Sequence, residues 1–402
     1  MTAAAETPPG SPAARRLLIV DDNEMNRDLL SRRLKQQGHR VANARNGREA
    51  LEMIAAEEFD LVLLDIMMPE LDGYKVLERM NAEGTLDQLP VIMISAVTEM
   101  ESVIRCIEMG ATDYLPKPFN PVLLKARVGA TLEKKWLRDR ERLWAKSLER
   151  DLEIGREIQR SFLPEELPKP AGWEIAARFQ PARQVAGDFY DAFSLGGGQR
   201  VGLVVADVCD KGVGAALFMA LFRSLLRAFA ERAFVEPVVP RDGSDSVRLL
   251  STVVSTNDYI ARTHGSANMF ATAFVAVLDP AGGSLTWVNA GHEAPVVCAT
   301  AGVRDRLPPT GPALAMMPDM KFEARESLLA PGETLFAFTD GVTEAKDGSG
   351  RFYSEERLLA LIAEKAPSAS ALLDRVEADV SAHSSGAERS DDITMLAVRR
   401  TG

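Results

Sequence analysis

The sequence predicts a multidomain protein with an α/β doubly wound N-terminal domain, a long linker helix and an α+β C-terminal domain. Three observations carry this prediction. Apolar runs alternate with helical periods up to residue 120, a charged segment poor in glycine follows to about residue 163, and strand-like runs joined by glycine-rich turns fill the rest. A chain of 402 residues is long enough for two or three domains.

The N-terminal domain, residues 15–120, is expected to contain a parallel sheet. Its apolar runs are continuous, as in Leu17–Val20, Phe59–Leu64 and Val91–Ile94, and helical patterns lie between them. Continuous apolar strands are buried on both faces, which is typical of a sheet covered by helices on each side. The preceding residues, 1–14, lack an apolar signal core and are expected to form a disordered leader.

Residues 121–165 are expected to form the linker helix, which prolines from Pro164 onward bring to an end. Apolar residues recur along it, several of them four or seven positions apart. This pattern fits either a short coiled coil between two copies of the chain or an amphipathic helix packed on one domain. We favour the first and expect a homodimer. The recurring apolar residues are Leu132, Trp136, Leu143, Leu148, Ile154, Ile158 and Phe162.

The C-terminal domain, residues 166–402, is expected to combine antiparallel strands with helices on the sheet faces. Strand-like runs such as Arg200–Ala206 and Thr334–Phe338 recur, and Gly196–Gly198 has the composition of a hairpin turn. Helical patterns occupy four segments: Ala215–Glu231, Ser246–Arg262, Glu355–Ala366 and Ala369–Ala382.

Composition excludes several classes of protein. A net charge of −11 argues against a broad nucleic-acid-binding surface. The three cysteines, Cys106, Cys209 and Cys298, are isolated, which argues against a disulfide framework or a zinc site and fits a reducing cytosol. The longest apolar run, Val213–Phe222, is shorter than the roughly 20 residues that span a bilayer. We therefore expect a cytoplasmic protein that binds neither nucleic acid nor membrane.

Acidic residues follow two apolar strands of the N-terminal domain. Asp21 and Asp22 come directly after the first run, and Asp65 comes after the next. The carboxyl ends of parallel strands form the binding crevice of such a sheet, and clustered carboxylates require a cation. Oxygen ligands suit Mg²⁺, while Lys117 and the Ser95 hydroxyl are placed to reach a phosphoryl group in the same crevice.

A second set of acids lies at strand ends in the C-terminal domain. Asp188, Asp207, Asp340 and Asp391 come from four separate segments, several of them beside glycine. Such a cluster needs compensating charge, which two divalent cations would supply while activating a water for in-line attack on phosphorus. Ligands of oxygen alone favour Mg²⁺ or Mn²⁺ over zinc.

Four motifs in the N-terminal domain resemble those of a response-regulator receiver domain. They are Asp21-Asp22, Leu63 to Gly73, Ile94-Ser95 and Tyr114 to Phe119. The resemblance covers about residues 15–125. It implies a five-stranded parallel sheet and control by a histidine kinase that donates a phosphoryl group.

The same resemblance assigns roles to individual residues. It implies that Asp65 accepts the phosphoryl group and that Asp22, Asp65 and the carbonyl of Met67 hold Mg²⁺, with Asp21 supporting the site. It also implies that Lys117 compensates phosphate charge and precedes a cis peptide bond to Pro118. Phosphorylation is expected to rearrange a hydroxyl and an aromatic side chain, Ser95 and Tyr114.

Five motifs in the C-terminal domain resemble the phosphatase family of the stage II sporulation protein E type. This family belongs to the metal-dependent protein phosphatases of the 2C kind. The resemblance covers about residues 155–400 and implies an α-β-β-α sandwich that binds two Mn²⁺ or Mg²⁺ ions. The motifs are Val185–Phe193, Val205–Ala220, Asn289–Pro295, Ala337–Ala345 and Asp391–Arg399.

Carried over to this chain, the family pattern makes Asp207 the ligand shared by both metals, with the carbonyl of Val208 beside it. Asp188 and Asp340 complete the inner ligands, and Asp391 binds the second metal. Arg183 either holds the substrate phosphate or is solvated. The chain departs from the family pattern at Ala186 and Asp210, where glycine is common, and retains every ligand.

These features predict a two-component response regulator whose phosphorylated receiver controls hydrolysis of phosphoserine or phosphothreonine on a protein. By family analogy the substrate is an anti-sigma-factor antagonist of a partner-switching pathway. The alternative is a non-catalytic adaptor whose phosphatase-like domain binds a regulatory partner. A DNA-binding response regulator is rejected, because a helix-turn-helix and a basic C-terminus are lacking.

Overall fold

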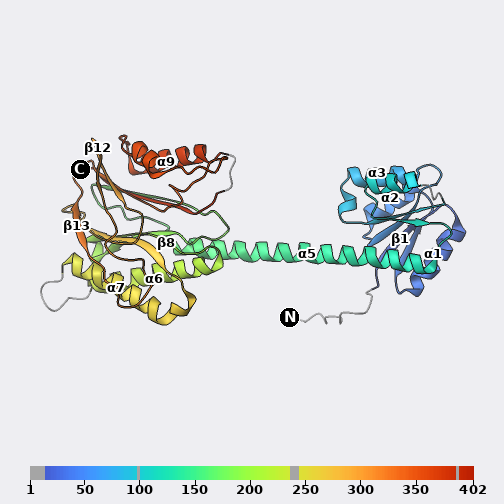
Figure 1. Ribbon diagram of the computed structural model, residues 1–402, viewed down its shortest axis with the longest axis horizontal. Coiled ribbons are helices and arrows are strands. Elements are labelled where there is room, and N and C mark those ends of the chain that lie inside the picture. Colours follow the sequence, from blue (N-terminus) through green and yellow to red (C-terminus); the bar gives the residue numbers. More distant parts are fainter. Residues whose placement is uncertain (1–13, 97–99, 236–243, 386–388) are drawn as a thin grey trace. The chain divides into compact units, whose positions relative to one another are not determined.

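The computed structural model describes residues 14–96, 100–235, 244–385 and 389–402 (Figure 1). The predicted leader lies outside the described residues except for Ala14. The chain divides into two compact units, with the boundary in the sequence between Leu148 and Glu149. We call them the N-terminal unit and the C-terminal unit.

The N-terminal unit contains a five-stranded sheet in the order β2-β1-β3-β4-β5, with all neighbours parallel. Helices α1 and α5 pack on one face, and α2, α3 and α4 pack on the other. This arrangement confirms the predicted doubly wound domain. The strands are β1 (Arg16–Val20), β2 (Arg40–Ala44), β3 (Leu61–Asp65), β4 (Val91–Ser95) and β5 (Asp113–Pro116), and the helices are α1 (Glu24–Gln36), α2 (Gly47–Ala56), α3 (Gly73–Ala82), α4 (Met100–Glu108) and α5 (Pro121–Phe162).

Helix α5 is one continuous helix of 42 residues. It starts at Pro121, where the missing N–H of proline is harmless, and the Asn120 side chain accepts hydrogen bonds from the next two backbone amides. Leu124 and Val128 are buried in the core of the N-terminal unit, whereas Trp144 is 75% exposed. Several apolar residues of α5 are exposed, as a helix that pairs with a second copy would require. The homodimer itself stays a prediction.

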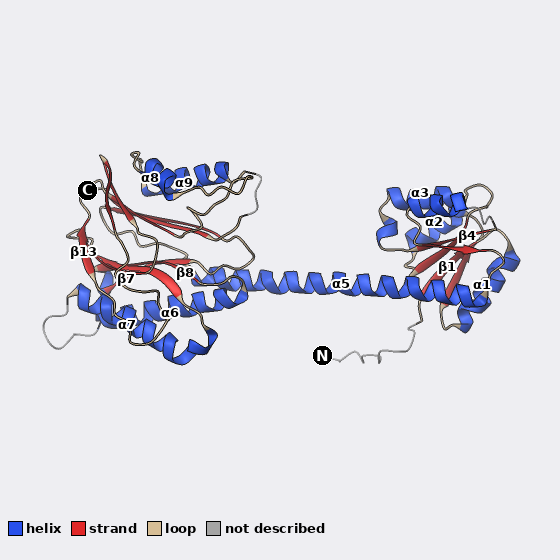
Figure 2. Cartoon of the chain, in the orientation of Figure 1, coloured by secondary structure: helices blue, strands red, loops and turns tan. Residues whose placement is uncertain are grey.

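The C-terminal unit contains two stacked antiparallel sheets, β13-β10-β9-β8-β7 and β12-β11-β14-β15-β6 (Figure 2). An apolar layer that includes Leu203, Phe274 and Leu396 fills the space between them. Helices α6 and α7 cover the outer face of the first sheet, and α8 and α9 cover the outer face of the second. The predicted α-β-β-α sandwich is confirmed.

The elements of the C-terminal unit follow one another along the chain from β6 to β15, and the hairpin predicted around Gly196–Gly198 joins β7 to β8. Their bounds are β6 (Trp173–Gln180), β7 (Phe189–Leu195), β8 (Arg200–Val208), α6 (Val213–Val235), α7 (Asp245–His264), β9 (Ala271–Leu278), β10 (Ser284–Ala290), β11 (Val296–Ala299), β12 (Gly302–Arg306), β13 (Arg325–Leu328), β14 (Thr334–Phe338), α8 (Glu355–Ile362), α9 (Ala369–His383) and β15 (Ile393–Arg400).

Helix α6 is longer and more apolar than the sequence suggested. Among the described residues it is the one helix whose length and composition would allow it to cross a membrane. The prediction that the longest apolar run ends at Phe222 is wrong, because the apolar stretch extends to Phe234. Arg223 within it is buried, and its guanidinium lies 3.1 Å from the Asp191 carboxylate on β7. Met219 and Phe222 are fully buried in the core that α6 shares with the sheet.

Candidate functional site

Three acids meet at the carboxyl edge of the parallel sheet. Asp21 and Asp22 follow β1, and Asp65 is the last residue of the neighbouring strand β3. One carboxylate oxygen from each lies within 4.8 Å of the others, and this is the one such group of three in the part of the chain that the structure describes. Asp21 and Asp65 are buried while Asp22 is exposed. Hard oxygen donors at this spacing fit Mg²⁺.

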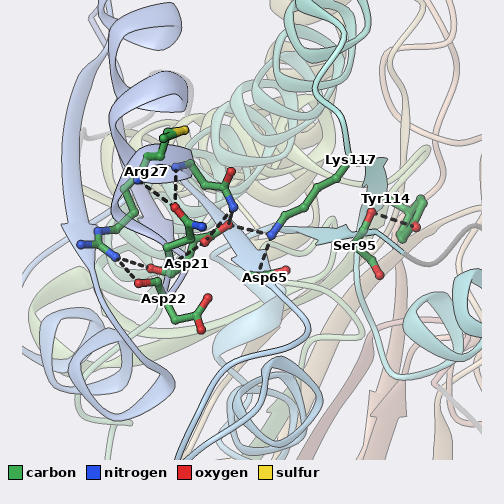
Figure 3. A network of polar contacts seen from close by, with 10 residues as sticks. Asp21, Asp22, Arg27, Asp65, Ser95, Tyr114 and Lys117 are labelled. Atoms are coloured by element: carbon green, nitrogen blue, oxygen red, sulfur yellow. Dashed lines mark hydrogen bonds and ion pairs between the residues drawn. The ribbon is translucent and has the colours of Figure 1, made fainter.

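Lys117 partly balances these acids. Its Nζ donates hydrogen bonds to Asp21 Oδ2 at 2.9 Å and to Asp65 Oδ2 at 2.8 Å (Figure 3). Burial alone would lower the pKa of the lysine, but the two carboxylates outweigh it and raise that pKa. Burial raises the pKa of Asp65, while the hydrogen bond from Lys117 opposes the rise. Three carboxylates facing one ammonium group leave an excess of negative charge that a divalent cation can neutralise.

The backbone holds Lys117 at this edge. Its N–H donates to the carbonyl of Ser95, the last residue of β4, and the peptide bond to Pro118 is cis, as predicted. The Tyr114 hydroxyl also lies 3.5 Å from the Ser95 carbonyl, so the predicted switch residues are neighbours (Figure 3). Met67 lies two residues beyond Asp65 with an exposed side chain.

Two residues of α1 that sequence reasoning missed also hold the acid pair. Asn26 Nδ2 donates to both carboxylate oxygens of Asp21 at 3.1 Å. Arg27 donates to the carbonyls of Asp21 and Asp22 at 2.7 and 2.9 Å. The signal was available in the sequence, since a helix that starts directly after the acids places its first turn beside them.

The four predicted acids of the C-terminal unit lie at one end of its two stacked sheets. Asp188 directly precedes β7 and Asp207 is the penultimate residue of its antiparallel partner β8. Asp340 follows β14 and Asp391 precedes β15, which are antiparallel partners in the other sheet. Antiparallel pairing therefore brings four segments that are far apart in the sequence to a common edge.

The acids perturb one another strongly. Burial, together with the charge of Asp340, raises the pKa of Asp207 to about 7. Burial, together with the charge of Asp391, raises the pKa of Asp340 to about 6. Asp188 is buried, and burial with the charges of Asp207 and Asp392 raises its pKa well above the usual range. Carboxylates in such mutual repulsion fit a site for hard cations.

Contacts across the two sheets position Asp188. The Thr339 hydroxyl, beyond β14, donates to Asp188 Oδ2 at 2.7 Å. Asp392 accepts hydrogen bonds from the backbone amides of Ala182 and Gly187 at 2.7 and 2.9 Å and so fixes the loop that leads to Asp188. Sequence reasoning missed this role of Asp392.

Glycines allow the backbones at this edge to approach closely. A Cβ on Gly341 would lie 1.8 Å from the carbonyl oxygen of Asp392, and a Cβ on Gly187 would lie 2.7 Å from that of Val208. Both glycines neighbour a predicted metal ligand. Only glycine fits either position without moving a strand end.

Asp391 has a different partner. Lys211 Nζ donates to Asp391 Oδ2 and to the Ser390 carbonyl, each at 2.7 Å. The four acids are also more spread than those of the N-terminal unit, since no three of their oxygens within the described chain satisfy the 4.8 Å separation. Arg183 is exposed in the loop before Asp188.

The comparisons with known proteins match one family model to each of the two units. A family model described as stage II sporulation protein E matches residues 197–401, just over half of the chain. The chain belongs to the stage II sporulation protein E family. A model of the response regulator receiver domain matches residues 17–129. The N-terminal unit is therefore a receiver, and the C-terminal unit carries the phosphatase-type domain of the family.

Two relatives match parts of this chain. Protein IcfG of Synechocystis is 43% identical over 263 residues, which are 62% of this chain and 41% of IcfG. Response regulator MprA of Mycolicibacterium vanbaalenii is 41% identical over 119 residues, which are 30% of this chain and 51% of MprA. The chain thus spans about two fifths to one half of the length of these relatives.

One solved structure resembles the C-terminal fold of this family member. The SiaA-PP2C domain of Pseudomonas aeruginosa superposes with a TM-score of 0.52 and 21% identity, covering 63% of this chain and 98% of that domain. At this identity the likeness concerns the fold alone.

The end of α5 contacts the phosphatase-type domain through Gln159. This buried side chain donates from Nε2 to the Ala186 carbonyl at 2.6 Å and accepts from the Ala186 amide at 2.9 Å. Ala186 lies two residues before Asp188. The last turns of the linker helix are thus hydrogen-bonded to the loop that carries a candidate metal ligand, which sequence reasoning did not foresee.

Proposed function

We propose that this protein is a metal-dependent phosphatase that hydrolyses phosphoserine or phosphothreonine on a protein and is controlled by phosphorylation of its receiver. One observation carries the proposal: acids from four separate segments gather at one edge of the stacked sheets, where burial and neighbouring carboxylates raise the pKa of Asp188, Asp207 and Asp340. Family membership supports the same reaction class.

In this proposal Asp188, Asp207, Asp340, Asp391 and the Val208 carbonyl hold two Mn²⁺ or Mg²⁺ ions. Bound ions of this kind supply a water nucleophile at neutral pH and stabilise the charge that develops on the phosphoryl oxygens. Thr339 and Asp392 orient the ligands and the loop that carries Asp188. Arg183 is proposed to bind the substrate phosphate as a bidentate donor.

Metal removal tests the proposal. We expect the full chain to hydrolyse p-nitrophenyl phosphate and a phosphoserine peptide with Mn²⁺, and EDTA to reduce both rates to the uncatalysed background. Adding Mn²⁺ in excess of the chelator should restore them. Phosphate release measured at several Mn²⁺ concentrations gives the answer, and turnover that survives EDTA would contradict metal dependence.

The adaptor alternative has one observation in its favour. The ammonium group of Lys211 already binds Asp391, a predicted ligand of the second metal. An adaptor would bind a phosphoprotein without releasing phosphate at any Mn²⁺ concentration, so the same assay separates the two functions.

The receiver is proposed to take its phosphoryl group from a histidine kinase. An Asp65 oxygen attacks the phosphorus of a phosphohistidine, the P–N bond breaks, and an acyl phosphate forms on Asp65. Asp22, Asp65 and the Met67 carbonyl would hold Mg²⁺ there, with Asp21 supporting the site. Lys117 compensates the added charge, and Ser95 and Tyr114 rearrange toward the phosphoryl oxygens.

The contact of Gln159 with Ala186 supports control through the linker helix, because a shift of α5 would move the loop that carries Asp188. We expect beryllofluoride, which mimics an aspartyl phosphate, to change the phosphatase rate of the wild type severalfold. Asp65→Asn should remove the response and keep the basal rate. Equal rates with and without beryllofluoride in the wild type would contradict control by the receiver.

The proposal also covers the substrate, the oligomeric state and the cellular location of the protein. The substrate is proposed to be an anti-sigma-factor antagonist, and the exposed apolar residues of α5 are proposed to pair two copies of the chain. A cytoplasmic location fits both units, since histidine kinases deliver phosphoryl groups on that side of the membrane.

A further inference from the structure

A cavity of about 220 Å³ opens beside the candidate phosphatase centre. It lies among the turn after β14, the C-terminal end of α9 and the segment before β15. Asp391 lines it, as does Gly341, the neighbour of Asp340. The cavity therefore shares one proposed metal ligand, Asp391, with the candidate centre and borders the residue next to another.

Its size limits what it can bind. Pockets for cofactors and drug-sized ligands are usually about 300–1,000 Å³, whereas a dry cavity of about 150 Å³ already accepts a benzene ring. A volume of about 220 Å³ lies between these values. It suits one large aliphatic side chain with a few displaced waters.

The buried part of the cavity wall is apolar, whereas serines and charged residues, among them Ser384, Ser390 and Asp391, line its more exposed part. Ala345, Val380 and Ile393 line the cavity and are themselves at least nine-tenths buried, so they offer an apolar surface already held in the core. Two exposed cations, Lys346 and Arg389, also line it. The Nζ of Lys346 lies over the exposed Phe352 ring, 5.2 Å from its centroid.

We propose that this cavity binds an aliphatic side chain of the phosphoprotein substrate, next to the phosphorylated residue, and that Lys346 and Arg389 attract acidic groups flanking it. The inference rests on the proposed phosphatase function and adds a determinant of specificity. An extended peptide advances about 3.5 Å per residue. Because the cavity shares Asp391 with the acid cluster, a residue one or two positions from the phosphoserine can reach it.

The test compares phosphoserine peptides on the full-length protein with Mn²⁺. The peptides carry alanine around the phosphoserine, with leucine, glutamate or lysine placed singly at each of the two positions on either side. We expect leucine at one position to raise kcat/KM about tenfold over alanine, as filling an apolar subsite typically does. Glutamate should exceed lysine at a neighbouring position.

A variant that fills the cavity makes the test specific. Ser381 lines the cavity on the last turn of α9, and the exposed Ala382 beside it does not. Ser381→Trp should bring the ratio of leucine to alanine peptide close to one, and Ala382→Trp should keep the tenfold ratio. A ratio measured on one enzyme preparation is independent of the fraction that folds.

The outcomes separate this inference from the proposed function. Absence of phosphate release from every peptide and from p-nitrophenyl phosphate would contradict the phosphatase itself. An active wild type without a leucine preference, or a preference that survives Ser381→Trp, would overturn the cavity assignment alone. Loss of the preference in both tryptophan variants would overturn it as well.

Discussion

Replacing Asp207 by alanine should abolish Mn²⁺-dependent phosphatase activity, with kcat falling about 1,000-fold or more. The carboxylate lies at the centre of the acid cluster, where its pKa is raised to about 7 by burial and by neighbouring acids. If it is the ligand shared by two metals, its loss removes both the activated water and the charge that stabilises the transition state, each worth several kcal/mol. Initial rates with p-nitrophenyl phosphate across a range of Mn²⁺ concentrations measure the effect.

A matched acid elsewhere in the domain provides the control. Asp305 is exposed on β12. Among the described residues, its carboxylate accepts a hydrogen bond from the backbone amide of Arg306 alone. Asp305→Ala should keep wild-type rates. Substantial turnover by Asp207→Ala at saturating Mn²⁺ would show that the shared-ligand assignment is incorrect.

The second large effect concerns stability. Gly341→Ala should destabilise the phosphatase-type domain by about 3 kcal/mol or more, because the new methyl group would lie 1.8 Å from the Asp392 carbonyl oxygen. Relief requires the ends of β14 and β15 to separate, which would also move Asp340 and Asp391. Thermal unfolding followed by circular dichroism should show a clearly lowered midpoint, and Mn²⁺-dependent turnover should fall with it.

Gly348→Ala is the corresponding control. It lies in the same connection after β14, and a Cβ there meets no atom within 4 Å. Its unfolding midpoint should match that of the wild type. A Gly341→Ala protein as stable as Gly348→Ala would mean that the backbones at this edge separate easily, against the close approach described.

The sequence predicted the architecture because buried strands carry a strong signal. Leu61–Asp65 is fully buried, and its continuous apolar character indicated a parallel sheet covered on both faces. Two edge strands of the C-terminal unit carry no such signal. Both β12 and β13 are mostly exposed and rich in arginine and acids, so neither was distinguishable from a loop before the structure supplied their partners.

Acids at strand ends could be predicted, but their individual contacts could not. Asp391 and Asp392 are adjacent and chemically identical, yet Lys211 binds the first while backbone amides bind the second. Consecutive residues of an extended segment face opposite sides, and only the register of β15 determines which is which. The contact of Gln159 could not be predicted either, because its partner Ala186 lies 27 residues away on a loop.

The common edge formed by Asp188, Asp207, Asp340 and Asp391 joins two sheets whose facing sides pack on each other through an apolar layer. A ligand that bridges these residues would hold the two sheets together. Its binding site would exist only while both sheets are folded. Its contribution to folding would grow logarithmically with concentration, to roughly 2.7 kcal/mol at a hundred times its dissociation constant. The concentration of manganese or magnesium in the cell would then determine how well this domain resists proteolysis as well as how fast it hydrolyses its substrate.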